Sequence, residues 1–87
     1  MVNEVVIDGI KCKEITDVAL VSYLLTAGGK MVRFINRGGR TAFYFIDEEL
    51  DDSIMRYYNR QGVVDALTFA ETLRNIKSLA VKKAKEN

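Results

Sequence analysis

The chain contains no histidine and no tryptophan, and its only cysteine is Cys12. Without histidine it lacks the commonest general base and the commonest metal ligand of proteins. A single cysteine cannot form an internal disulfide, and without a histidine partner it is a poor candidate nucleophile. We therefore expect a non-enzymatic protein that needs no cofactor and keeps Cys12 as a small core residue.

Proline is also absent, and no glycine-rich or serine-rich linker interrupts the 87 residues. We therefore expect residues 1–87 to form a single domain, just large enough for one core. No apolar run approaches the ~20 residues that span a bilayer. The first residues, MVNEVVIDGIK, lack the basic-then-apolar order of a signal peptide. These features favour a cytoplasmic protein with no membrane partner.

The formal net charge of +1 does not by itself indicate a nucleic-acid or membrane partner. The charge is nevertheless polarised along the chain, because residues 47–52 read DEELDD whereas the last fourteen residues are rich in lysine and arginine. An acidic run can hold a divalent cation through its carboxylates. Consecutive helical residues point in different directions, however, and acidic first turns of helices are ordinary, so we expect no metal site.

Two hairpins are predicted. The first has Asp8 and Gly9 as its turn, because both central positions of such a turn need positive φ. Its register would place Glu4 opposite Lys13 and Ile7 opposite Ile10.

The second hairpin, RFINRGGRTAFYF at residues 33–45, would turn at Gly38 and Gly39. The predicted cross-strand pairs are Val32 with Phe45, Arg33 with Tyr44, Phe34 with Phe43, and Arg37 with Arg40. Alternation then gives one core side, formed by Val32, Phe34, Phe43 and Phe45, and one outward side that carries the arginines and Tyr44.

Three helices are predicted from caps and apolar spacing. The first begins at Thr16 or Asp17 and ends at Gly28. The second is capped by Asp47, buries Leu50, Ile54, Tyr57 and Tyr58 on one stripe, and ends at Gly62. The third is capped by Asp65, with Val64 and Phe69 as a hydrophobic staple and a core stripe at Ala66, Phe69, Leu73, Ile76 and Ala80. The fold class is α+β: a small antiparallel sheet of two hairpins packed against three helices, in the order β-β-α-β-β-α-α.

The stretches TDVALVSYLLTAGGK, FYF, YYN and VDALTFAETLRNIKS together resemble a small domain family of unknown function found in phages and mobile elements of Firmicutes. The resemblance covers about residues 16–79, and its motifs are mostly structural. It implies a phage or integrated element in a bacterial cytoplasm, and it brings no catalytic residues.

The glycine-centred hairpin is the main candidate for a binding site. Arg37 opposite Arg40 is mildly unfavourable unless an anion lies between them. Arg33 beside Tyr44 adds a pair able to stack on bases, so we predict nucleic-acid binding through Arg33, Arg37, Arg40 and Tyr44. The alternatives are a charged turn that only deters strand-to-strand aggregation, and a protein-interaction module that binds or inhibits a host or phage protein.

The last helix carries a second candidate surface. Leu67, Arg74 and Val81 recur every seven residues, off the predicted core stripe. Such a strip in a small domain favours a homodimer or another protein interface. Scattered surface apolar residues are the ordinary alternative.

Overall fold

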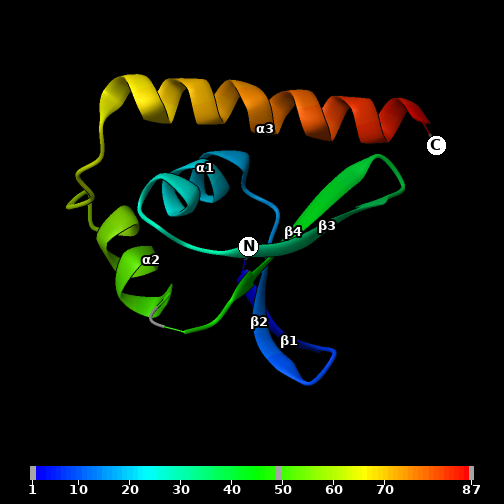
Figure 1. Cartoon of the computed structure of the whole chain (residues 1–87), viewed down its shortest axis with the longest axis horizontal. Helices are drawn as coiled ribbons and strands as arrows, with labels where there is room; N and C mark the ends of the chain where they lie inside the picture. The colour runs from blue at the N-terminus through cyan, green and yellow to red at the C-terminus, as the bar shows by residue number, and fades with distance from the viewer. Residues whose placement is uncertain (1, 49, 87) are drawn as a thin grey trace.

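The structure, a computed structural model, describes residues 2–48 and 50–86, with side chains described as far as residue 80. The element order is the predicted β-β-α-β-β-α-α, and it forms an α+β fold (Figure 1). The elements are β1 (Val2–Ile7), β2 (Ile10–Ile15), α1 (Val18–Thr26), β3 (Met31–Arg37), β4 (Arg40–Ile46), α2 (Leu50–Tyr58) and α3 (Ala66–Glu86).

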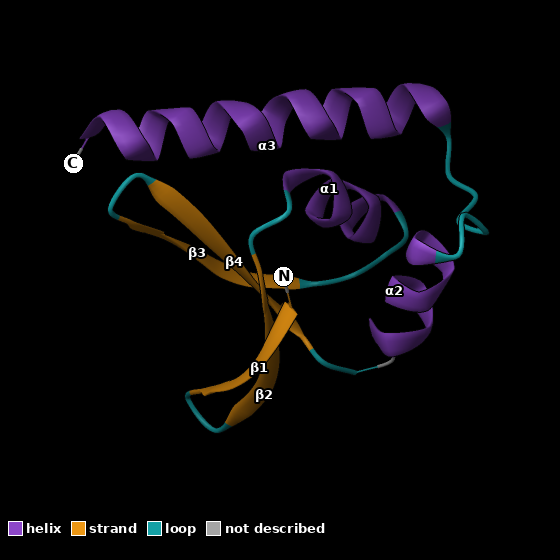
Figure 2. Ribbon diagram, turned by 180° about the vertical axis from the view of Figure 1, so that it is seen from behind, coloured by secondary structure: helices purple, strands orange, loops and turns teal. Residues whose placement is uncertain are grey.

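The strands form one antiparallel sheet in the order β1-β2-β4-β3, so the two hairpins are joined through β2 and β4. Figure 2 shows α1 between the strands and α3, and α2 beside α1 at the end away from the β3–β4 turn. The core follows this layering, because Leu20, Val21 and Leu24 of α1 pack in one cluster with Ile15, Phe43 and Phe45 of the sheet. Packing of α1 against the sheet therefore holds the two hairpins on one scaffold.

Both hairpin turns have the predicted positions and backbone. Asp8 and Gly9 have φ of 50° and 80°, and Gly38 and Gly39 have φ of 59° and 86°. In the first hairpin Glu4 pairs with Lys13 and Ile7 with Ile10, as predicted. The positive φ angles match the right-handed twist of the strands, which is why glycine is favoured there.

The second hairpin differs from the prediction at Val32. Phe34 pairs with Phe43 and Arg33 with Tyr44, but Met31 rather than Val32 lies opposite Phe45, because an irregularity of the β-bulge kind falls between Met31 and Arg33. Val32 is left exposed instead of facing the core. A bulge on an edge strand interrupts its ladder, so β3 is poorly suited to pair with a further strand.

The first helix has the predicted ends. Asp17 is its N-cap, and its carboxylate accepts hydrogen bonds from the backbone N–H groups of Ala19 and Leu20. Gly28, with φ of 100°, follows the helix, and the N–H of Gly29 donates to the Leu24 carbonyl at 2.7 Å. The AGGK sequence is thus a helix stop whose amide groups serve the helix end.

The second helix spans Leu50–Tyr58 and ends earlier than predicted. The N–H of Leu50 donates to the Asp47 carbonyl at 3.2 Å, and the Asp47 carboxylate forms an ion pair with Lys13. The left-handed residue after the helix is Arg60, with φ of 59°, rather than Gly62. Leu50 and Ile54 are buried as predicted, whereas Tyr58 is exposed.

The third helix is capped as predicted by Asp65, whose carboxylate accepts hydrogen bonds from the Thr68 N–H at 2.8 Å and the Thr68 hydroxyl at 2.7 Å. These bonds lower the pKa of Asp65. Ile76 is buried and Phe69, Leu73 and Ala80 are half-buried, but Ala66 is exposed because the first turn extends past the layer below. No helix in residues 2–48 and 50–86 has the length and apolar character needed to cross a membrane.

Candidate binding site

The face of the sheet turned away from α1 contains a groove between the two hairpins. Alternation along β4 places Phe43 and Phe45 on the α1 side and Tyr44 on the opposite side. The groove has a volume of about 380 Å³. It is lined by Asn3, Val5, Val6 and Ile7 of β1, Glu14 of β2, Arg33, Ile35 and Arg37 of β3, and Tyr44 of β4.

Tyr44 lies at the floor of this groove and is only 2% exposed. Its hydroxyl donates a 2.6 Å hydrogen bond to Glu14. Burial and the Glu14 carboxylate raise the pKa of Tyr44, while the Tyr44 hydroxyl and the Asn3 amide lower the pKa of Glu14. The prediction that Tyr44 offers an open stacking surface is therefore wrong, because the neighbouring strands cover its ring.

Two of the three predicted arginines contact carboxylates of the first hairpin. Arg33 lies 3.2 Å from Asp8, in the β1–β2 turn, although β1 and β3 are the opposite edges of the sheet. Arg37 lies 3.7 Å from Glu14. The sheet therefore curls on this face so that its two edges approach each other, which no sequence pattern indicated.

The third predicted arginine, Arg40, lies beside Arg37 at the β3–β4 turn. Arg37 lies opposite Arg40 as predicted, and both are exposed. Within the described part of the chain Arg40 makes no ion pair. Figure 1 shows this turn below the C-terminal half of α3, and α3 contacts both β3 and β4.

Most basic residues of α3 lie in the same C-terminal half of that helix, and Arg74 lies just before its midpoint. Arg74 and Lys77 are exposed, and Lys82, Lys83 and Lys85 follow in its last turns, beyond the side chains that the structure describes. The two basic segments predicted from the sequence are thus adjacent in space. They form one end of the molecule, whereas the acidic residues that open α2 lie elsewhere (Figure 1).

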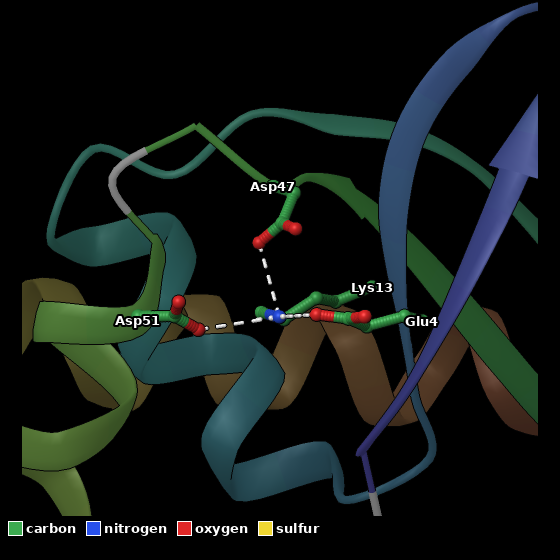
Figure 3. A network of polar contacts seen from close by, with 4 residues as sticks. All are labelled: Glu4, Lys13, Asp47 and Asp51. Atoms are coloured by element: carbon green, nitrogen blue, oxygen red, sulfur yellow. Dashed lines mark hydrogen bonds and ion pairs between the residues drawn. The ribbon is translucent and has the colours of Figure 1, made fainter.

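A buried lysine, which the sequence reading missed, joins the first hairpin to α2. Lys13 has only 6% of its side chain exposed, and its ammonium lies 3.2 Å from Glu4, 3.0 Å from Asp47 and 3.2 Å from Asp51 (Figure 3). The Asp47 contact is an ion pair without hydrogen-bond alignment.

The charge state of this lysine follows from its surroundings. Burial alone would lower the pKa of Lys13, but the carboxylates of Asp47, Asp51 and Glu4 raise it further than burial lowers it. The amine therefore stays protonated and is unsuited to act as a base or nucleophile. The predicted pairing of Glu4 with Lys13 identified one carboxylate that contacts this lysine. It did not indicate Asp47 and Asp51, which follow β4 in the chain.

The predicted strip on α3 is only partly described. Leu67 is 70% exposed and Arg74 is exposed, whereas the side chain of Val81 lies outside the described residues. Other large exposed apolar residues lie before the helix, at Met55 and Tyr58 on α2 and at Val63 in the connection. Large exposed apolar side chains also occur away from the start of α3, on the strands and later in the helix, at Val6, Ile10, Val32 and Leu79. Within the described side chains they are therefore scattered rather than gathered in one strip.

Comparison with known proteins yields a family but no functional relative. No curated protein and no solved structure matches the chain. The model of the family described as Domain of unknown function (DUF5659) matches residues 11–82, from β2 into the last turns of α3. Since this match includes most of the chain, the protein belongs to the DUF5659 family, as the resemblance to a family of unknown function predicted.

Proposed function

We propose that the protein is a non-enzymatic accessory protein that binds nucleic acid through the basic β3–β4 turn. The observation that supports this most is the position of Arg37 and Arg40 at an exposed turn, at the same end of the molecule as the basic half of α3. Clustered lysine and arginine side chains attract phosphate groups, and the described basic side chains of α3, Arg74 and Lys77, are both exposed.

The energetics of the turn favour an anionic ligand. Like charges directly opposite each other in a hairpin are destabilising. Glu14 lies 3.7 Å from Arg37 and partly offsets its charge, but no carboxylate of the described residues lies within ion-pair distance of Arg40. A phosphate between the two guanidinium groups would relieve this repulsion, and glycine-specific φ angles at residues 38 and 39 hold the turn in place.

The positions of Tyr44 and Arg33 also indicate which part of a nucleic acid the protein can contact. Because Tyr44 is buried and Arg33 contacts Asp8, neither is available to read or stack on bases without a rearrangement. Contacts to phosphate fix position but carry no sequence information. We therefore propose binding through the phosphate backbone, with weak dependence on sequence and strong dependence on salt.

The biological setting belongs to the same proposal. We place the protein in the cytoplasm of a bacterial host, as a product of a phage or mobile element, on the basis of the family resemblance. Its non-enzymatic character is supported by the absence of histidine and by the full burial of Cys12 on β2. A buried thiol without a basic partner is unsuited to nucleophilic chemistry.

The proposal is tested by fluorescence anisotropy with single-stranded and double-stranded oligonucleotides over a range of salt. An Arg37→Ala, Arg40→Ala variant should bind more weakly and show a salt dependence shallower by about one unit of slope for each lost phosphate contact. A Lys11→Ala, Arg56→Ala variant removes the same charge from exposed positions on β2 and α2, away from the β3–β4 turn, and should behave as the wild type. Absence of wild-type binding at low salt, or an equal loss in both variants, would contradict the proposal.

A protein partner is the second candidate function, and the groove between the hairpins favours it. This groove presents half-buried apolar side chains at Val5, Ile7 and Ile35 beside the polar Glu14 and Arg37. That mixture is usual for protein interfaces. If oligonucleotides do not bind, affinity capture from the host with the wild type and with an Ile35→Glu variant should distinguish proteins that depend on this groove from background.

A further inference from the structure

A second groove lies where α1, α2 and α3 meet, at the opposite end from the basic turn. It has a volume of about 260 Å³ and contains aromatic rings from all three helices. Its lining residues are Tyr23, Tyr57, Arg60, Gly62, Val64 and Phe69. An apolar groove of this kind that also carries a charged group has the composition of an interface pocket.

The walls of this groove are held by close packing. The rings of Tyr23 and Tyr57 pack with their centroids 5.5 Å apart. Gly62 lies so close to Tyr23 that a Cβ on it would be 2.6 Å from a ring carbon. Val64 and Phe69, the predicted staple of α3, pack as partly buried residues against the core. The groove is therefore preformed and needs little rearrangement to accept a side chain.

An apolar side chain projects beside the groove without entering it. Val63 is 92% exposed, although its neighbours Gly62 and Val64 both line the groove. Leu67, in the first turn of α3, is also largely exposed. This surface therefore has an exposed apolar side chain, Val63, next to an apolar groove that could accept such a side chain from another molecule.

The charges around Val63 are arranged in a self-complementary order. Arg60 precedes it by three residues and the exposed Asp65 follows it by two. If two copies of segment 60–65 run antiparallel about a point between Gly62 and Val63, Arg60 lies opposite the second copy's Asp65. The same register places Val63 opposite the second copy's Gly62, which lines the groove. The order of charged and apolar residues in the segment is thus compatible with one antiparallel register.

We propose that this surface is a homodimer interface in which Val63 of each copy occupies the aromatic groove of the other. A two-fold axis makes both contacts at once, because an isologous interface pairs residue i with j and j with i. Leu67 lies at the edge of the interface, and Arg74 lies outside it. The interface therefore differs from the seven-residue strip predicted on α3, and it is independent of the proposed nucleic-acid site.

The first test is sedimentation velocity from micromolar to near-millimolar protein. The wild type should change from monomer to dimer over this range. Val63→Asp should weaken dimerisation by at least about tenfold, as expected for a central anchor residue. Ile10→Asp is the matched control, because Ile10 is also exposed but lies at the start of β2, and it should dimerise as the wild type. A wild type that stays monomeric, or equal weakening by both variants, overturns the proposal.

The second test uses charge exchange. Arg60→Glu and Asp65→Lys each place like charges at both contacts of a homodimer and should dimerise poorly alone. An equimolar mixture restores opposite charges at both contacts of the heterodimer, so dimers should reappear. Circular dichroism of each variant checks that loss of the Asp65 cap leaves α3 folded; if it does not, Val63→Asp decides alone. A mixture of folded variants that remains monomeric while the wild type dimerises overturns the register.

Discussion

The Tyr44 hydroxyl and the Glu14 carboxylate, on neighbouring strands β4 and β2, share a hydrogen bond of 2.6 Å at the floor of the groove between the hairpins. Glu14 also receives the Asn3 amide of β1 and lies near Arg37 of β3. Side chains of all four strands therefore meet on the sheet face that carries no helix. This network explains how a face with several charges encloses an aromatic ring.

Replacement of Tyr44 by phenylalanine should raise the pKa of Glu14 toward its ordinary value, because the strongest cause of the lowered pKa is the Tyr44 hydroxyl. Loss of a hydrogen bond to a carboxylate should also reduce the free energy of unfolding by about 1–2 kcal/mol. Carbon-detected NMR titration of the glutamate carboxyl groups measures the first effect and urea unfolding the second. An unchanged Glu14 titration in the variant would show that Tyr44 does not control it.

The same pair predicts how stability depends on pH. The pKa of Glu14 is lower in the folded than in the unfolded protein, so its contribution is present above the unfolded pKa and disappears as pH falls through the folded pKa. The pKa of Tyr44 is raised, so its contribution is present below the unfolded tyrosine pKa and is lost as pH rises through the folded value. The Tyr44→Phe variant should lose less stability than the wild type at both extremes of pH, as measured by urea unfolding across the pH range.

Lys13 should be the most sensitive position of the ionic cluster. Lys13→Met leaves the half-buried Asp47 carboxylate without its counter-ion, and breaking such a buried pair costs about 3 kcal/mol. Glu4→Gln and Asp51→Asn remove carboxylates that are about four-fifths exposed, so each should cost less than about 1 kcal/mol. Chemical unfolding measures the three losses of stability, and equal losses in all three variants would contradict a dominant role for Lys13.

Gly62→Ala should destabilise the protein by about 1–3 kcal/mol, because the added Cβ overlaps the ring of Tyr23. The appropriate control is the same change in a Tyr23→Leu background, which removes the ring atoms that the Cβ meets. A double-mutant cycle should give a smaller penalty for Gly62→Ala in that background. If the penalty is the same in both backgrounds, its origin is the backbone rather than the ring.

Substitution of Arg60 should change the stability of the protein according to how well the new residue tolerates a positive φ. Its φ of 59° is unfavourable for any residue with a Cβ, so Arg60→Gly should be at least as stable as the wild type. Arg60→Val should lose about 1 kcal/mol or more, because β-branched residues are least tolerant of positive φ. Thermal unfolding compares the stability of the two variants directly. A valine variant as stable as the glycine variant would contradict the positive φ at residue 60.

Local features of the fold were predictable from the sequence. Asp8-Gly9 and Gly38-Gly39 specify turns because their backbone preferences act over two residues. Asp17 and Asp65 specify helix starts because a cap involves only the next three residues. The element order and α+β class followed from these signals, together with the alternation of Phe43 and Phe45.

The candidate sites depend on contacts between residues far apart in the chain, and here sequence reasoning was incomplete. Alternation correctly sent Tyr44 away from the helices, but it could not show that Glu14 and the curled edges of the sheet bury it. The approach of Asp8 to Arg33 depends on how the sheet twists over four strands. Lys13 is buried because Asp47 and Asp51 reach it from another part of the chain. Periodicity and caps determined each element because their energies are local, whereas side-chain environment was decided by how the elements pack together.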